Sequence, residues 1–187
     1  MTSRRTALGL AVAAGAASLA GAGVNSFASA DTSAAAVETV HLQLRPSSPE
    51  LASCFPKAHA HVAVDLTTDA IGKDTFRLTA ENLKPRTTFT VFLIKKAASP
   101  FGAAEYIGDV TTGAKGNGSA TFKLIVEEAF AFNNRTGART DLNSIGMWFA
   151  DPKDDNGCLG AGSPVTGFDG DASAGVQMLN SGAQKLP

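Results

Sequence analysis

Apolar and polar residues alternate with a period of two along most of this chain, and this pattern limits its possible folds more than any other feature. Val40, Leu42 and Leu44 alternate with polar neighbours, and the pattern recurs in the runs 61–66 and 76–81. Successive side chains of a β-strand point to opposite faces, so each run gathers its apolar residues on one face. The pattern predicts antiparallel strands that bury one face and leave the other in water.

Two further runs are apolar on both faces. The segment 88–94 reads TFTVFLI and the segment 144–150 reads SIGMWFA. A strand without a polar face is typical of a strand covered on two sides. We therefore expect 88–94 to be a central strand and Trp148 to be a core residue.

The remaining strand signals lie at 106–112, 120–126 and 174–180. The first two flank a glycine-rich segment with an Asn-Gly pair, which predicts a hairpin between them. Residues 126–133 alone have the composition of a short helix. The whole pattern predicts an all-β fold, an immunoglobulin-like antiparallel β-sandwich of about eight strands, with a closed barrel as the alternative.

One local motif supports the sandwich. The nine residues LKPRTTFTV at 83–91 resemble the Leu-x-Pro-x-Thr-x-Tyr corner of fibronectin type III domains, with Phe89 at the tyrosine position. In that family the corner carries the chain from one sheet to the other. In this chain Pro85 would fix the backbone angle φ at the corner, and the side chain of Leu83 would pack into the core. The phenylalanine lacks the hydroxyl that would bond back to the main chain.

Residues 1–30 have the composition of an export signal. Arg4-Arg5 precede an Ala/Gly-rich apolar stretch, and Ala28-Ser29-Ala30 supplies the small residues of a cleavage site. The glycines dilute the stretch too far for a membrane anchor. The paired arginines and the weakly hydrophobic stretch resemble a bacterial twin-arginine signal, and an ordinary secretory signal is the alternative. We expect cleavage after Ala30 and an extracellular protein.

Composition limits what such a domain does. The formal net charge is −1, so the basic excess of a nucleic-acid-binding protein is missing. Hydrophobic residues make up 44% of the chain, which excludes a disordered polypeptide. After a short flexible linker at 31–36, residues 37–187 are expected to form a single domain with no membrane span.

The chain has two cysteines, Cys54 and Cys158, each in an expected loop. In an oxidising compartment an even number of cysteines indicates a disulfide. The bond would close a loop of about a hundred residues and remove roughly 4–5 kcal/mol of unfolded-state freedom. Two separate buried thiols are the alternative. We interpret the bond as structural.

All three histidines fall on the polar faces of the first two expected strands. His59 and His61 are two residues apart on one strand, and His41 projects from the matching side of its neighbour if the two strands pair. Imidazoles arranged in this way can hold zinc or copper. The alternative is that they are solvated residues on a polar sheet face.

A second group of possible ligands is acidic. Asp151, Asp154 and Asp155 lie in the segment DPKDDNG, and two more aspartates follow in FDGD at 168–171. Loops rich in aspartate and glycine can supply the oxygens that calcium needs, but the helix-loop-helix calcium spacing is broken here. Aspartate, asparagine, proline and glycine are also the residues that tight turns select, and this is the interpretation we favour.

No nucleophile elbow and no phosphate-binding glycine loop occurs in the sequence. We therefore expect a secreted, non-catalytic binding module without a cofactor. Its unknown partner, an extracellular protein or a glycan, would meet loops at one end of the sandwich. A metal-binding extracellular protein is the alternative and a hydrolase a residual possibility. Phe101, Phe130 and Phe132 in connecting segments are the expected exposed apolar patch.

Overall fold

The structure is a computed structural model that describes residues 38–66, 73–126, 129–167 and 173–187. The expected signal at 1–30, the linker at 31–36 and the aspartates of FDGD lie outside the described residues. The strands are β1 (Glu38–Pro46), β2 (His59–Leu66), β3 (Asp74–Glu81), β4 (Thr88–Ile94), β5 (Ala104–Thr111), β6 (Gly118–Leu124), β7 (Phe130–Asn133), β8 (Ala138–Asp141), β9 (Ser144–Phe149), β10 (Thr166–Gly167), β11 (Ser173–Ala174) and β12 (Gln177–Asn180). The helices are α1 (Pro49–Cys54), the 3-10 turn η1 (Pro152–Asp155) and α2 (Asn156–Leu159).

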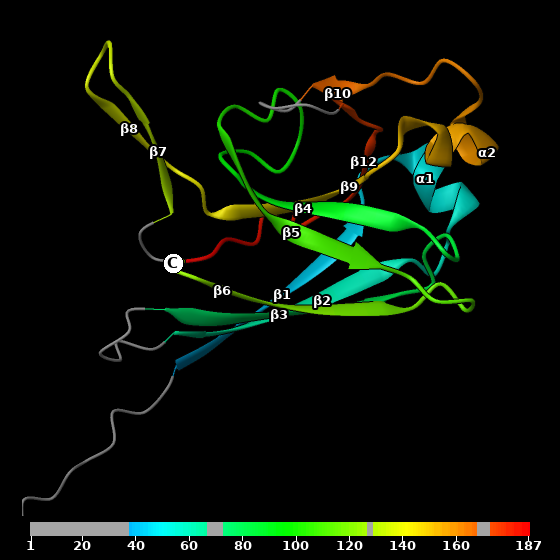
Figure 1. The fold of residues 1–187 in the computed structure, drawn as a ribbon, viewed down its shortest axis with the longest axis horizontal. Helices are drawn as coiled ribbons and strands as arrows, with labels where there is room; N and C mark the ends of the chain where they lie inside the picture. The colour runs from blue at the N-terminus through cyan, green and yellow to red at the C-terminus, as the bar shows by residue number, and fades with distance from the viewer. Residues whose placement is uncertain (1–37, 67–72, 127–128, 168–172) are drawn as a thin grey trace, which may run out of the picture. The chain divides into compact units, whose positions relative to one another are not determined.

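Eight of these strands form two antiparallel layers packed face to face (Figure 1). Sheet A has the order β1-β2-β3-β6, and sheet B has the order β5-β4-β9-β12. The end of β1 continues into sheet B, because Arg45 and Pro46 pair with Asn180 and Leu179 of β12. At the opposite side β5 and β6 are not paired, so the described strands make a sandwich and not a closed barrel.

The core lies between the two layers and follows the alternation of the sequence. In β3 every second residue is buried, and the outward residues are exposed or half-buried. Sheet A contributes Leu42, Leu44, Val62, Val64, Phe76 and Leu78, and sheet B contributes Phe89, Val91, Ile145, Met147 and Phe149. Burial of these side chains is the main stabilising contribution to the fold. The all-β antiparallel sandwich confirms the predicted fold class and is compatible with an immunoglobulin-like or fibronectin-like domain.

Sheet B carries a second, smaller core on its outer face. Phe92 and Trp148 point outward from β4 and β9, and Phe101 from the following loop packs on Trp148 with the ring centres 5.0 Å apart. Lys96 N–H donates to the carbonyl of Phe101, which holds this loop back over the sheet. The predictions that 88–94 is a central strand and that Trp148 is a core residue are therefore confirmed.

The segment that resembles the fibronectin corner lies between β3 in sheet A and β4 in sheet B. Leu83 and Phe89 are both buried, as the motif requires. The hydroxyl of Thr112 donates to the carbonyl of Lys84 over 2.6 Å and accepts from the N–H of Thr87 over 3.0 Å. These bonds tie the corner to the end of β5, where the chain crosses between the sheets.

The predicted hairpin between 106–112 and 120–126 is wrong. The strand β5 pairs with β4 and the strand β6 pairs with β3, so the turn between them carries the chain from one sheet to the other. The turn itself is tight, with Gly113 N–H donating to the carbonyl of Asn117 over 2.9 Å. Each strand has an apolar face to bury against the opposite layer, and this demand overrides the local hairpin signal.

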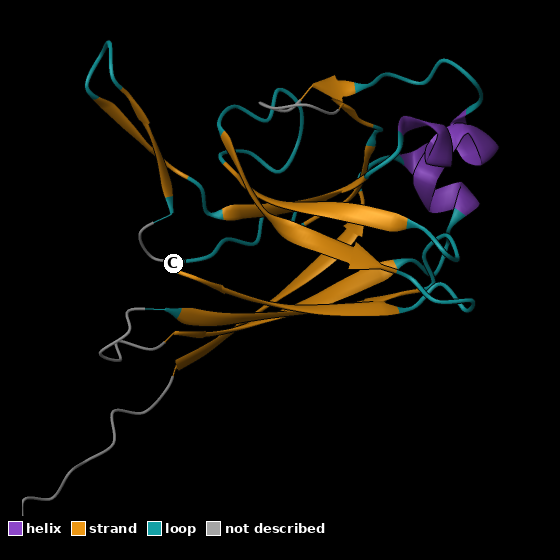
Figure 2. Ribbon diagram, viewed as in Figure 1, coloured by secondary structure: helices purple, strands orange, loops and turns teal. Residues whose placement is uncertain are grey.

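Three segments differ from expectation in their local structure. The possible helix at 126–133 is wrong over its described part, because β7 pairs with β8 around a turn in which Gly137 has φ +68°. Both loops that hold the cysteines contain short helices instead of irregular chain (Figure 2). The helix α1 begins where the Ser48 hydroxyl accepts from Leu51 N–H and Pro49 takes the first helical position.

Candidate functional site

A cleft of about 710 Å³ lies next to the loops that cover the outer face of sheet B. Its walls come from four segments far apart in the sequence: the chain at 47–51 entering α1, the loop at 98–101, the chain at 159–167 after α2, and the start of β12 at 176–177. A concave site built by several connecting segments on a rigid sheet is where binding residues are usually found.

The walls of the cleft combine apolar side chains with hydroxyls. Phe101, Leu159 and Val165 provide apolar surface, and Val165 is 58% exposed. The hydroxyl of Ser47 donates to the Gln177 carbonyl, and the hydroxyl of Ser163 donates to the buried Asp155. These hydrogen bonds tie the segments around Ser47 and Ser163 to neighbouring parts of the cleft wall.

Among the described residues that line the cleft, Gln177 carries the one buried side-chain polar atom without a hydrogen-bond partner. The residue is 6% exposed, and its Oε1 accepts from Asn180 Nδ2 over 3.0 Å. Its Nε2 is buried and has no hydrogen-bond partner. A buried amide donor without a partner costs roughly 1–3 kcal/mol of stability. A hydrogen-bond acceptor on a bound ligand is one explanation for its presence.

Glu50 is the only charged residue in the described lining of this cleft. Its pKa is lowered, first by the hydrogen bond from its own backbone N–H and then by the hydroxyl of Ser48. The carboxylate is therefore held in its ionised form at the first turn of α1, and it gives this end of the cleft a negative charge.

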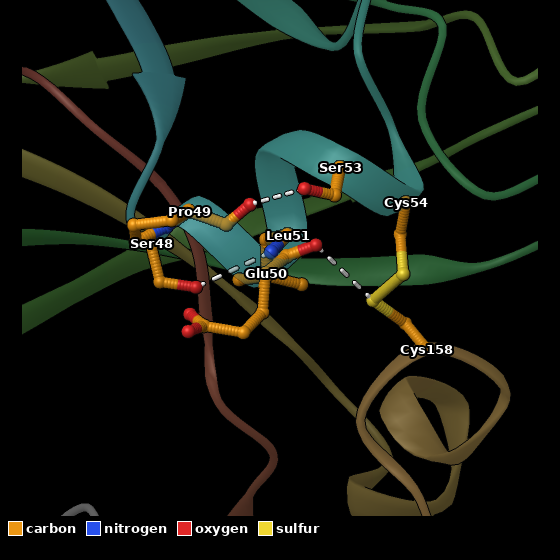
Figure 3. Close-up of a disulfide and its surroundings, with 7 residues drawn as sticks. All are labelled: Ser48, Pro49, Glu50, Leu51, Ser53, Cys54 and Cys158. Atoms are coloured by element: carbon orange, nitrogen blue, oxygen red, sulfur yellow. Dashed lines mark hydrogen bonds between the residues drawn. A yellow bond between two sulfur atoms is a disulfide. The ribbon is translucent and has the colours of Figure 1, made fainter.

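The disulfide ties two walls of the cleft together. Cys54 at the end of α1 bonds to Cys158 in α2, with Cα atoms 5.9 Å apart and a sequence separation of 104 (Figure 3). Sγ of Cys158 lies 3.8 Å from the carbonyl oxygen of Glu50. The predicted disulfide is confirmed, and it joins the helix that carries Glu50 to the helix whose last residue is Leu159.

A second hollow of about 400 Å³ adjoins the first, because both include Phe101, Thr166 and Gly167. Phe92 and Tyr106 complete its aromatic wall, with ring centres 5.6 Å apart. Tyr106 is 55% exposed, and its pKa is raised by partial desolvation and then by the charge of Asp109. We call these two adjoining hollows the groove over sheet B.

The structure brings two of the three histidines together. His41 and His61 lie on the outer face of sheet A with their ring centres 5.2 Å apart. His59 projects from the same face, but its Nδ1 lies 2.9 Å from the Lys57 carbonyl and its Nε2 lies 3.8 Å from Glu81. In the described ranges no group of three His, Cys, Asp or Glu side chains is placed to hold a metal ion.

The acidic segment is explained by local structure. Asp151 caps η1 by accepting from Lys153 N–H over 2.8 Å, and Asp154 pairs with Lys84 at 2.6 Å. Asp155 is fully buried and accepts from Val176 N–H over 3.0 Å. Each carboxylate holds a neighbouring segment, which agrees with the interpretation as turn chemistry.

The expected aromatic patch divides between two places. Phe130 and Phe132 are 41% and 56% exposed on the β7–β8 ribbon, with the guanidinium of Arg139 over the Phe130 ring. Phe101 belongs instead to the groove over sheet B.

Sequence reasoning missed Ser48, Glu50 and Gln177. A Ser-Pro-Glu helix start and a glutamine inside the apolar run AGVQMLN were the available signals.

In comparisons with known proteins, no family model and no curated protein matches this chain. Within the part of the chain that the structure describes, no helix has the length and apolar character needed to span a membrane.

Proposed function

We propose that this protein is a secreted, non-catalytic binding module of the immunoglobulin-like class, whose ligand occupies the groove over sheet B. Export by the twin-arginine route or by an ordinary secretory signal belongs to the same proposal. A disulfide that ties the groove walls together supports it, since such bonds persist in oxidising compartments. The ligand meets the loops that cover one sheet, and not only those at an end of the sandwich.

The observation that carries this proposal is the partnerless Nε2 of Gln177 in the cleft lining. A ligand that offers a carbonyl oxygen would satisfy this donor once the Gln177 amide turns away from Gly146, against which it lies, and into the cleft. Glu50 adds a negative charge, while Phe101 and Val165 add apolar surface. A carbonyl oxygen, a positive charge and an apolar side chain occur together in a basic, partly apolar peptide segment. We therefore favour an extracellular protein over a glycan as the partner.

Three dipeptides of matched size test the proposal. Acetyl-Phe-Lys-amide, its neutral norleucine analogue and acetyl-Phe-Glu-amide are titrated into isotopically labelled protein and followed by NMR. We expect shifts confined to residues 47–51, 98–101, 163–167 and the side-chain amide of Gln177, with affinity falling from lysine to norleucine to glutamate. Shifts spread over both sheets, or preferred binding of a neutral oligosaccharide at the groove, would contradict the proposal.

Matched variants separate the two polar contributions. Gln177→Leu removes the buried donor and should weaken all three peptides by about fivefold, the size of one net hydrogen bond. Glu50→Gln should remove only the preference for lysine, a change of about two- to fivefold for an exposed charge pair. Gln43→Leu and Glu38→Gln make the same changes in β1, away from the groove lining, and should leave binding unchanged.

A further inference from the structure

We propose that His41 and His61 form a binding site for one divalent transition-metal ion that prefers imidazole, with Cu²⁺ bound more tightly than Zn²⁺. The site lies on the outer face of sheet A. It shares no residue with the groove over sheet B, and the proposal does not depend on the function assigned to that groove.

The register of β1 and β2 creates the pair. His41 lies opposite Ala63, and His61 lies opposite Gln43, so the two histidines are diagonal neighbours on one face of an antiparallel ladder. Long side chains at such diagonal positions reach one another. The two imidazole rings accordingly lie with their centres 5.2 Å apart and their planes inclined by 30°.

This separation matches what one metal ion requires. With ordinary metal–nitrogen distances of about 2.0–2.1 Å, two imidazoles have ring centres roughly 5 Å apart on a tetrahedral ion and roughly 4.5 Å apart at adjacent positions of a tetragonal Cu²⁺ ion. The ring centres are therefore near the required spacing before an ion arrives, and because the rings are stacked, rotations about the side-chain bonds must turn one nitrogen of each ring toward a common point. Water completes the coordination, because both rings are exposed on the sheet surface.

The ring nitrogens of the pair are available, in contrast with those of His59. Among the described residues no hydrogen bond or ion pair engages His41 or His61, whereas both nitrogens of His59 face protein oxygens. Two arginines flank the pair: Arg77, which lies opposite Ala63, pairs with Asp65, whereas Arg45 donates to Gln43, the residue opposite His61, and forms no ion pair among the described residues. A cation at the pair therefore meets a compensated arginine on the β3 side, and the positive charge of Arg45 on β1 opposes its binding.

The histidines provide a sharp test with an internal control. Untagged protein is titrated with Cu²⁺ by calorimetry, and the bound ion is examined by electron paramagnetic resonance. We expect one equivalent to bind with hyperfine structure from two imidazole nitrogens. His41→Gln and His61→Gln should each weaken binding by about tenfold or more, as loss of a ligand requires, while His59→Gln changes it by less than about twofold.

The remaining outcomes contradict the proposal. If both His41→Gln and His61→Gln bind Cu²⁺ like the parent protein, the ion binds elsewhere on the chain. If His59→Gln weakens binding as much as the other two, the site is not the pair described here. All three positions lie on the outer face of a strand, so circular dichroism is expected to show the same fold in each variant.

Discussion

The two sheets of this sandwich use the same alternation on their inner faces but differ on their outer faces. In β3 of sheet A the outward residues are polar and face solvent, whereas all six residues of β9 in sheet B are buried. Sheet A faces the core with its inner side and water with its outer side. In sheet B the central strands β4 and β9 are covered on both sides, and their outer cover includes walls of the groove.

The comparison shows what a strand pattern can specify. The polarity of the residues on each face of a strand indicates whether that face is covered, because an apolar face in water is unfavourable. They do not report what covers it. Here the cover is made by the loop around Phe101 and by Ala174, two segments with no periodicity of their own.

The largest expected effect comes from removing the disulfide with Cys54→Ser and Cys158→Ser together. With a sequence separation of 104, the chain-entropy model predicts a loss of about 4–5 kcal/mol in the free energy of unfolding. Because the bond joins α1 to α2 at the groove, peptide binding over sheet B should weaken at the same time. Denaturant unfolding and NMR titration measure the two effects.

The same double variant should leave Cu²⁺ binding at His41 and His61 unchanged in protein that is still folded. Equal loss of both kinds of binding would contradict the separation between the two faces.

The second prediction concerns the outer core of sheet B. Phe92→Ala removes a ring that is 6% exposed, and it should lower the free energy of unfolding by about 3–4 kcal/mol. Thr79→Ala, on the outer face of sheet A, should change it by less than about 0.5 kcal/mol. Chemical unfolding of both variants checks the difference, and a small effect of Phe92→Ala would mean that the outer face of sheet B is not packed.

Much of this fold could be predicted from the sequence because strand periodicity is a local property. The strand at 76–81 and the doubly apolar run at 88–94 lie close to β3 and β4. The short helices α1 and α2 have too few residues to show a helical period. The hairpin prediction failed because pairing is decided by the opposite layer, which no local turn signal reports.

The candidate site was harder to predict than the fold. The pairing of Cys54 with Cys158 followed from counting cysteines. Glu50, Phe101 and Gln177 come from three distant segments that meet only after the sandwich forms, so no motif marks them as parts of one site. The closeness of His41 and His61 depends on the strand register, which the sequence left conditional on strand pairing.

The third prediction tests the side of the sandwich at which β5 of sheet B and β6 of sheet A are not paired. Gly108 has φ +147°, and a Cβ there would lie 2.3 Å from Cε1 of Phe122 in β6. Gly108→Ala should therefore cost about 1–3 kcal/mol through overpacking and backbone strain. Gly137→Ala, at φ +68° with open space around it, isolates the backbone cost of about 1 kcal/mol. Equal thermal shifts for the two would show that β5 and β6 do not pack closely.

The smallest expected effect is electrostatic and belongs to the open face of sheet A. The hydrogen bond from Arg77, followed by that from Thr39, lowers the pKa of Asp65 below its ordinary value of 3.8. Since the folded pKa is the lower one, the stabilisation is present above pH 3.8 and is lost as the pH falls below that value. The difference in stability between the parent protein and Arg77→Ala should therefore shrink in acid. A difference that grows in acid would contradict the pairing.

The most direct test of the covered face uses the only tryptophan of the chain. Trp148 is fully buried between sheet B and the loop that carries Phe101. Its fluorescence should be shifted to short wavelength in the folded, oxidised protein, with acrylamide quenching far weaker than for free N-acetyltryptophanamide. Quenching equal to that of the free compound would show that the outer face of sheet B is open to water, and the groove described here would not exist.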